Sequence, residues 1–407
     1  MSGIHTSNVE SPWILRYPAS GLNLAARTPV HTRRSFLPKL APLVVVGAVL
    51  ALTSCSRGAN QTLVIGLSGP FSQARGVAMR RAAELAVREV NARGGRQIAL
   101  RIMDDSGSAA VAIRVARELL DDPTVVAVIG HLSSGSSLAA GRVYSGGRRP
   151  LAMISPSASS PDLSGVSPYV FRVCPSDLSH GAQLARYAQQ TIGAKRAAII
   201  YINDDYGRGL RQSFATEFRR LGGTIVEEDP MLSATPSLEP YLSRLRQTGA
   251  PDVLMLATER GGAELALREM RRIGVAWPTI GGDALTGIEG LGALAQGVRL
   301  STAYLPDRPG DANQRFVAAY ARAYNGERSD HRGAGAYDIV QLLARAFAAG
   351  ATTWCVVRVC LAHVGGTVPA FEGVTGTIAF DAQGDVPAKS VVIGVVRDGH
   401  LVTEASQ

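Results

Sequence analysis

Two groups of hydroxyl side chains follow short apolar runs in the first half of the chain. The runs are Val125–Ile129 and Leu151–Ile154, and the segments after them read Gly130-His131-Leu132-Ser133-Ser134-Gly135-Ser136-Ser137 and Ser155-Pro156-Ser157-Ala158-Ser159-Ser160. Hydroxyls and free backbone N–H groups at the start of a helix bind anions such as a carboxylate. The serines of these segments are therefore candidate carboxylate ligands. From position alone, helix capping explains each serine at least as well.

Carboxylate side chains follow three similar runs in the second half. The segments are Asn203-Asp204-Asp205-Tyr206-Gly207 after Ala197–Ile202, Thr258-Glu259-Arg260 after Val253–Ala257, and Gly281-Gly282-Asp283 after Thr279–Ile280. Carboxylates attract a cation, so the two halves together suit a zwitterion, such as an amino acid. From position alone, Glu259 and Asp283 are equally well explained as solvated loop carboxylates, and Tyr206 as a residue packed at a helix start.

Apolar runs and helical patterns alternate along the chain around these segments. The other expected strands are Thr62–Leu67, Ile98–Met103 and Thr224–Glu228. The expected helices are Val77–Asn91, Ala109–Leu120, one ending near Tyr144, Gly209–Leu221, Leu238–Gln247 and Gly262–Ile273. This alternation predicts βαβ units and parallel sheets. Ligands of such sheets bind at the carboxyl ends of the strands, where the polar segments stand.

The alternation falls into two sets, separated by the loop-rich stretch Ser155–Val173. After Ala303 come three further helical patterns, Ala312–Tyr324, Gly335–Ala349 and Thr352–Ala362, and a closing β region. A chain of 407 residues has the length of two or three domains. We therefore predict an α/β protein with two Rossmann-like lobes, each built on a parallel sheet.

The sequence contains no enzyme motif that we can identify. Gly130 and Gly135 are one residue too far apart for a nucleophile elbow. No Walker A sequence occurs, and no Gly-x-Gly-x-x-Gly follows the first strand. We expect a binding protein rather than an enzyme, without a cofactor.

The histidines and cysteines show no spacing typical of a metal site. We expect His131, His180, His331, His363 and His400 to be surface or structural residues. His131 is the exception, because it stands beside the serines and could orient their loop. Cys355 and Cys360 lie about 140° apart around a helix, which favours buried thiols over a bridge; a contact with Cys174 stays open.

The net charge of +9 invites a nucleic-acid interpretation, but the pattern argues against it. Lys39, Lys195 and Lys389 are the only lysines among 42 basic residues, so arginine usage indicates a GC-rich genome. Loss of residues 1–54 would remove five basic residues and one acidic residue, leaving +5. The remaining arginines are scattered and form no stripe with aromatic residues, so we expect no nucleic-acid partner.

The N-terminal segment resembles an export signal. Paired arginines in Thr32–Lys39 precede a 13-residue apolar run, Leu40–Leu52, which is too short to span a bilayer. The run ends in Leu52-Thr53-Ser54-Cys55, which resembles a bacterial lipobox. We expect a signal peptide over 1–54, lipidation of Cys55 and a tether over 55–61. The paired arginines favour the twin-arginine export route, and the general secretory route is the alternative. Residues 1–31 lack any pattern, so the true start codon is also open.

From Thr62 to about Val402 the chain resembles the leucine/isoleucine/valine-binding proteins, which have the type I periplasmic-binding-protein fold of ABC importers. The most specific stretch runs from Phe371 to Asp385 and reads Phe371-Glu372-Gly373-Val374-Thr375-Gly376-Thr377-Ile378-Ala379-Phe380-Asp381-Ala382-Gln383-Gly384-Asp385. The segments Ser68–Pro70, Val128–Ser134, Ile154–Pro161 and Asp205–Gly209 match in the same order. The resemblance implies three hinge crossings between an N-terminal lobe (62–175 plus 305–388) and a C-terminal lobe (176–304 plus 389–407).

The resemblance also implies site roles. Ser134 would hold the ligand carboxylate, and Ser157, through its backbone, and Ser159, through its hydroxyl, would complete the contacts to the carboxylate and the ammonium group. Tyr206 would close over the ligand, and Asp283 would face the ammonium group. Glu259 stands where the family often has an aromatic residue, and Gln73–Arg75 offers no aromatic either. These departures argue against a branched aliphatic ligand and favour a polar one.

The resulting prediction is an extracytoplasmic lipoprotein, anchored to the outer face of the cell membrane. It would bind an amino acid or a related polar solute, such as an amide, by hinge closure, and deliver it to an ABC permease. The alternative is a sensor lipoprotein that uses the same fold to signal through a membrane partner such as a kinase.

Overall fold

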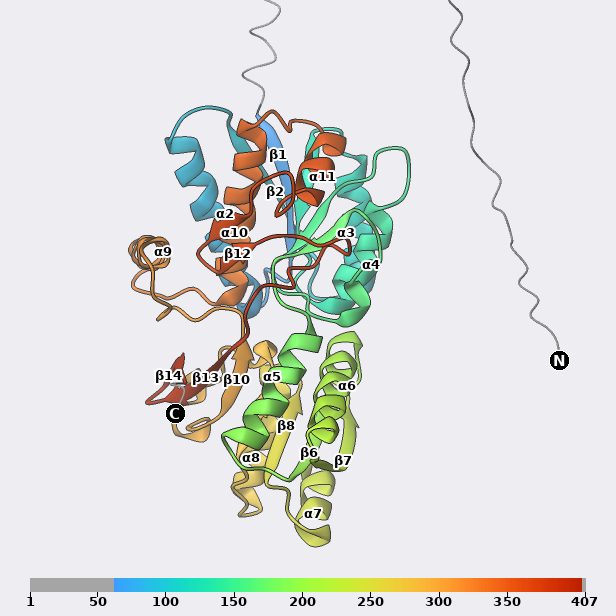
Figure 1. Cartoon of the computed structure of the whole chain (residues 1–407), viewed down its shortest axis with the longest axis vertical. Coiled ribbons are helices and arrows are strands. Elements are labelled where there is room, and N and C mark those ends of the chain that lie inside the picture. The colour runs from blue at the N-terminus through green and yellow to red at the C-terminus, as the bar shows by residue number, and fades with distance from the viewer. Residues whose placement is uncertain (1–61, 405–407) are drawn as a thin grey trace, which may run out of the picture. The chain divides into compact units, whose positions relative to one another are not determined.

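The computed structural model describes residues 62–404, which belong to the compact unit Ser56–Gln407. The expected signal peptide, the lipidated Cys55 and the tether over 55–61 lie outside the described residues. Within 62–404, no helix has the length and apolar character needed to cross a membrane. The described chain is built around two large sheets (Figure 1).

The first sheet contains five parallel strands in the order β2-β1-β3-β4-β5. The strands are β1 (Leu63–Gly69), β2 (Ile98–Asp104), β3 (Val125–Ile129), β4 (Met153–Ser155) and β5 (Val170–Arg172). The helices on it are α2 (Ala74–Ala92), α3 (Ala109–Asp121), α4 (Ser134–Tyr144), α10 (His331–Ala348) and α11 (Trp354–Ala362). One apolar core joins the sheet to α2, α10 and α11, and another joins it to α3 and α4. Because helices cover both faces, β3 is buried at every residue.

The second sheet has seven strands in the order β14-β13-β10-β9-β8-β6-β7. The strands are β6 (Arg196–Ile202), β7 (Thr224–Met231), β8 (Val253–Ala257), β9 (Thr279–Gly281), β10 (Arg299–Thr302), β13 (Val392–Arg397) and β14 (His400–Thr403). The helices around it are α5 (Asp177–Gln190), α6 (Asp205–Arg220), α7 (Glu239–Thr248) and α8 (Arg260–Arg272). Strands β13 and β14 are antiparallel additions to a parallel centre. The predicted fold class, two α/β lobes with parallel central sheets, is confirmed.

The chain passes between the two sheets three times. It leaves the first sheet after β5, returns after β10 through α9 (Asp311–Ala323) to α10, and leaves again after the hairpin of β11 (Phe371–Gly373) and β12 (Gly376–Ile378). Lys389 in the last crossing donates hydrogen bonds to the backbone oxygen of Val173 in the first (2.8 Å) and to Thr375 Oγ1 (2.6 Å). Burial lowers the pKa of Lys389 to about 8.

Arg172 stabilises the same region from the end of β5. Its side chain is 1% exposed, and its Nε lies 2.8 Å from Asp385 Oδ1. Its guanidinium also donates to the Ser160 carbonyl oxygen at 2.8 Å, and its backbone N–H donates to the Gly384 carbonyl oxygen at 3.0 Å. The loop that carries the closing sequence signature is therefore bound to β5 by buried charge and backbone contacts.

Several element boundaries differ from the predicted ones for local reasons. Strand β5 lies inside the stretch expected to be a loop, and its three residues are too few to show a periodic pattern. Helix α6 begins four residues before Gly209 because the Asp204 carboxylate accepts a hydrogen bond from the Gly207 N–H at 2.8 Å. Helix α10 begins four residues before Gly335, because Asp330 caps it in the same way.

Of the three cysteines in the described part of the chain, only one is buried. Cys174, Cys355 and Cys360 are all free thiols. The preference for buried thiols is therefore wrong for Cys355, which is exposed, because α11 buries Val357 and Leu361 instead.

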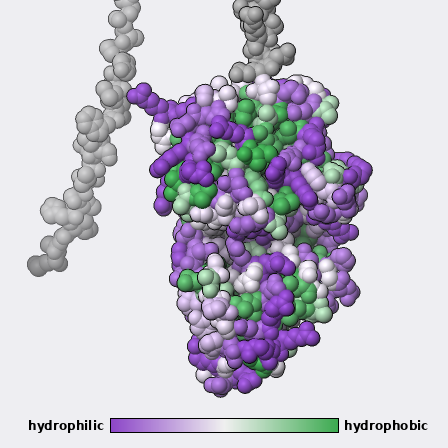
Figure 2. All heavy atoms as spheres, turned by 180° about the vertical axis from the view of Figure 1, so that it is seen from behind, coloured by the Kyte–Doolittle hydropathy of each residue, from purple (hydrophilic) through white to green (hydrophobic). Residues whose placement is uncertain are grey.

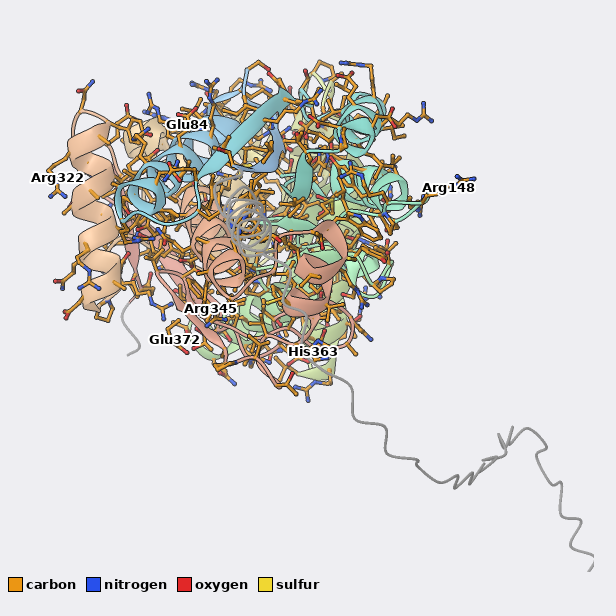
Figure 3. All side chains as sticks on the ribbon, turned by 90° about the horizontal axis from the view of Figure 1, so that it is seen from above. Glu84, Arg148, Arg322, Arg345, His363 and Glu372 are labelled. Atoms are coloured by element: carbon orange, nitrogen blue, oxygen red, sulfur yellow. The ribbon has the colours of Figure 1, made fainter. Side chains whose placement is uncertain are left out.

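Charged side chains are spread over the surface of the described residues. Hydrophilic side chains dominate the face in Figure 2, with small apolar patches between them. Arg148 and Arg322 extend outward on opposite sides of the view in Figure 3. This spread agrees with the scattered arginines of the sequence.

Gly384 gives a direct test of the packing between the closing loop and β5. Its φ of +79° is unfavourable for other residues, and a Cβ there would lie 2.2 Å from the Val170 carbonyl oxygen. Gly399 has a similar φ of +75° but no atom within 4 Å of such a Cβ. We expect Gly399→Ala to lower the free energy of unfolding by about 1 kcal/mol through its φ alone. Gly384→Ala should cost about 3 kcal/mol or more, because overpacking adds to the same strain.

Urea unfolding of the two variants measures the difference. Equal losses in the two proteins would show that the Val170 contact does not constrain the loop.

Candidate functional site

A cavity of about 930 Å³ lies where the carboxyl ends of strands from both sheets meet. All six residues predicted from the sequence line it: Ser134, Ser157, Ser159, Tyr206, Glu259 and Asp283. Ser134, Ser157 and Ser159 follow strands of the first sheet, whereas the other three follow strands of the second. The structure thus brings together side chains that the sequence placed at separate strand ends.

On the first-sheet side, capping does not account for two of the serines. Ser133, not Ser134, caps α4, and its Oγ accepts from the Ser136 N–H at 3.4 Å. The buried Ser134 Oγ instead accepts from the Ser160 N–H at 3.2 Å. Ser159 is 1% exposed, and its Oγ makes no close hydrogen bond within the described residues, although the hydroxyl interacts with the Asp177 carboxylate. These two hydroxyls can therefore face a ligand.

On the second-sheet side, two buried polar groups also lack partners. Asp283 is 3% exposed, and its Oδ2 makes no hydrogen bond in the described part of the chain. The Tyr206 hydroxyl is likewise buried without a close hydrogen bond there, although the Ala284 backbone N–H interacts with it. Burial raises the pKa of Tyr206 well above its usual value, which keeps it a neutral phenol. Its ring lies close to Gly282, where a Cβ would meet the hydroxyl oxygen at 2.3 Å. A carboxylate and a phenol are therefore available for a cationic or hydrogen-bonding group.

Glu259 forms an ion pair with Arg75 that joins the two sides of the cavity. Glu259 precedes α8 of the second sheet, whereas Arg75 lies in the first turn of α2. Their side chains are 42% and 23% exposed, and both line the cavity. The Arg75 Nε also donates to Gln73 Oε1 at 2.8 Å.

His331 was expected to be a surface or structural residue, but it lies between the two sides of the site. Its Nε2 is 3.3 Å from Ser157 Oγ and 3.5 Å from Asp283 Oδ2, and its Nδ1 is 3.3 Å from Thr286 Oγ1. Burial, followed by the charge of Arg332, lowers the pKa of His331 to about 4. The imidazole is therefore neutral at pH 7 and leaves the Asp283 carboxylate without a cationic partner.

The other histidines divide between core and surface. His131 and His180 are fully buried, whereas His363 and His400 are exposed. The expected orienting role of His131 fits its contacts: its Nδ1 lies 2.5 Å from Asp105 Oδ2, and its carbonyl oxygen accepts from the Ser137 and Ser155 hydroxyls. Residue His131 thus connects the two serine segments.

Asp177 is a second carboxylate beside the site that sequence reasoning did not single out. It is the first residue of α5 and is 0% exposed, and neither of its carboxylate oxygens makes a close hydrogen bond in the described residues, although the Ser159 hydroxyl interacts with them. Burial, and then the charge of Asp283, raise the pKa of Asp177 well above its usual value. Asp177 does not line the cavity, whereas Asp283 does.

Metal ligation finds no support among residues 62–404, where no group of three His, Cys, Asp or Glu side chains is arranged to hold an ion. The cavity lining is nevertheless highly charged. It includes four arginines and six acidic residues: Arg75, Arg260, Arg328, Arg332, Asp204, Asp205, Glu259, Asp283, Glu289 and Asp330. Tyr206 is the one aromatic residue in the described lining. The arrangement is suited to holding a small polar molecule by hydrogen bonds and charge.

Comparison with known proteins agrees with this geometry. A family model described as periplasmic binding protein matches residues 63–400. An amino acid binding protein of Pseudomonas aeruginosa is 29% identical over 236 residues, covering 56% of this chain and 62% of that protein. The Leu/Ile/Val-binding protein homolog 3 of Brucella melitensis is 25% identical over 372 residues, covering 89% of this chain and 98% of that protein.

Solved structures of similar proteins have the same fold. An ABC transporter substrate-binding protein from Desulfitobacterium hafniense, in complex with Leu, has 29% identity and a TM-score of 0.73, covering 84% of this chain and 100% of that chain. The branched-chain amino acid transporter substrate binding protein of Streptococcus pneumoniae, in complex with isoleucine, has 26% identity and a TM-score of 0.74, covering 84% of this chain and 98% of that chain.

The matched proteins are solute-binding proteins rather than enzymes. The resemblance predicted from the sequence motifs is confirmed by a family match over most of the chain and by two-lobed structural neighbours. The chain belongs to the periplasmic binding protein family, among the type I proteins related to the leucine/isoleucine/valine-binding proteins.

Proposed function

We propose that this chain is an extracytoplasmic solute receptor of an ABC importer, which binds an α-amino acid or a related small polar solute between its lobes. The observation that carries the proposal is the set of buried polar atoms at the cavity that make no close hydrogen bond within residues 62–404: Ser159 Oγ, Tyr206 OH and Asp283 Oδ2. A buried polar atom without a partner costs about 1–3 kcal/mol, so a ligand that supplies partners is favoured.

In this proposal, the adjoining carboxylate and ammonium groups at one end of the ligand are held by residues from opposite sides of the cavity. Ser134, with its place at the first turn of α4, and the serines after β4 hold the carboxylate. Asp283 binds the ammonium group by a charge-assisted hydrogen bond, and Tyr206 covers the ligand from the second sheet. No covalent step and no cofactor is needed.

Closure of the two lobes would enclose the bound ligand. We assign the N-terminal lobe to 62–175 plus 305–388 and the C-terminal lobe to 176–304 plus 389–407, with movement at the three crossings. A ligand that touches both lobes stabilises the closed state relative to the open one, so binding shifts the population toward closure. The closed form would then present the solute to a membrane permease.

Attachment to the membrane belongs to the same proposal. The arginine pair, the short apolar run and Cys55 support export followed by lipidation of that cysteine. The expected tether of 55–61 would keep the receptor at the outer face of the cell membrane. Mass spectrometry of the protein from cells tests this: a diacylglyceryl group should be found on Cys55 at the mature N-terminus.

A thermal-shift screen with the twenty amino acids tests the binding function. A ligand that binds the folded state raises the melting temperature by mass action. We expect at least one amino acid to do so at millimolar concentration. If neither amino acids nor simple amides shift the transition, the proposed function is wrong.

Asp283 should be the main determinant of amino-acid affinity. A charge-assisted hydrogen bond is worth about 1.5–3 kcal/mol, so Asp283→Ala and the isosteric Asp283→Asn should each weaken binding at least ~10-fold. Calorimetric titration with the amino acid found in the screen measures the loss, and the melting temperatures of the unliganded variants control for folding. Unchanged affinity in both variants would exclude the ammonium role.

His331 should make folding stability depend on pH in a defined window. Its pKa falls from an ordinary value of 6.5 to about 4 in the folded chain, so the unfolded chain binds more protons between these values. The free energy of unfolding should therefore decrease as the pH falls from 6.5 to 4, by up to about 3 kcal/mol from this residue. Urea unfolding across this range should show a smaller decrease for His331→Gln than for the unaltered protein.

The matched control is His400→Gln, because His400 is exposed in the folded chain. This variant should keep the unaltered profile. The assignment fails if His331→Gln and His400→Gln have the same pH dependence.

A further inference from the structure

The Arg75–Glu259 ion pair lies in the lining of the binding cavity, but the proposal above gives neither residue a part in holding the carboxylate or the ammonium group of the ligand. We infer that this pair recognises the side chain of the ligand, and that the preferred ligand is an amino acid whose side chain ends in a neutral carboxamide or ureido group. The inference rests on the proposed function, because it assigns the second end of a ligand whose first end is held by Asp283 and the serines.

The two members of the pair come from opposite sides of the cavity. Arg75 belongs to the first turn of α2, which follows β1, and Glu259 is separated from β8 by Thr258 alone. Both side chains line the cavity, so the pair presents a donor and an acceptor next to each other. A ligand that reaches this point meets two opposite charges that nearly cancel.

Arg75 is held in place by contacts within the first lobe. Its Nε donates to Gln73 Oε1 at 2.8 Å, and the Gln73 Nε2 donates to the Ser106 carbonyl oxygen at 2.8 Å. The absence of a side chain at Gly107 makes room, since a Cβ there would lie 2.4 Å from the guanidinium. The guanidinium is therefore positioned before a ligand arrives.

Glu259 has spare hydrogen-bonding capacity. Its side chain does not cap α8, and the one side-chain hydrogen bond recorded for it among residues 62–404 runs from Arg75 to Oε1. A carboxylate can accept about four hydrogen bonds, so Glu259 can accept another from a ligand without releasing Arg75.

The ion pair discriminates between side-chain types. An ammonium group is attracted by Glu259 but lies beside the Arg75 charge, and a carboxylate is attracted by Arg75 but repelled by Glu259 and by Asp204 nearby. An aliphatic side chain would remove water from both charges and replace none of its hydrogen bonds.

A carboxamide satisfies both members of the pair at once. Its carbonyl oxygen accepts from Arg75 while its NH₂ group donates to Glu259, and no net charge is introduced. A ureido group offers the same combination. Sites built to hydrogen-bond a polar group reject analogues that lack it, because their own polar groups are then left unpaired.

Calorimetric titration of the full chain with L-glutamine, L-asparagine, L-citrulline, L-glutamate, L-lysine and L-leucine tests the inference. We expect at least one of the first three to bind about 10-fold or more tightly than glutamate, lysine and leucine. Arg75→Gln and Glu259→Gln should each remove most of this preference, while the affinity for L-alanine, whose side chain does not reach the pair, stays within about threefold.

Glu84→Gln is the matched control, because it removes the Glu84–Arg80 ion pair on α2, which does not contribute to the cavity. It should leave every affinity unchanged. The inference is overturned if leucine binds more tightly than all three amide ligands, or if the two variants weaken alanine and amide ligands equally. In that case the proposed function stands, provided that binding still depends on Asp283. If no amino acid binds, the proposed function and the inference fail together.

Discussion

The direction of the central strands is the constraint on which the site depends. Parallel neighbours need crossover connections, so the carboxyl ends of successive strands collect at one edge of each sheet. In this chain β3 and β4 bring Ser134 and Ser159 to one such edge, whereas β6 and β9 bring Tyr206 and Asp283 to the other. Side chains far apart in the sequence can therefore line one cavity.

The charges that a ligand meets in the cavity depend on which nearby side chains are ionised. Burial keeps His331 neutral and raises the pKa of Asp177, while Asp283, which faces the cavity, has no cationic partner in the part of the chain that the structure describes. A protonated imidazole at His331 would occupy the position that an ammonium group requires. The low pKa of this histidine thus preserves the Asp283 carboxylate for a ligand.

Sequence reasoning predicted those parts of the molecule that depend on local patterns. Strand β3 is a continuous apolar run, and the serines after it have the composition of a helix start, so the position of Ser134 could be predicted. Asp283 and Glu259 could be found because each lies within three residues of the end of an apolar run. Strand β5 could not be predicted, since three residues are too few to show an alternating pattern.

The features of the site that could not be predicted from the sequence depend on tertiary contacts. Nothing near His331 in the sequence indicates Asp283, which is brought to it by the fold of the second sheet. Arg75 and Glu259 are 184 positions apart, so their pairing required the structure. That Ser134 does not cap α4 likewise became evident only from the structure, in which Ser133 caps the helix.

The bond from Lys389 to the backbone of Val173 has a mechanical consequence. It fastens the last crossing to the first, and the second crossing runs between the same two bodies. In the closure proposed above, fastened crossings would oppose sliding or twisting of one lobe against the other and would favour rotation about the crossings. Such a joint would sample few orientations, so little conformational entropy would be lost when the lobes came together.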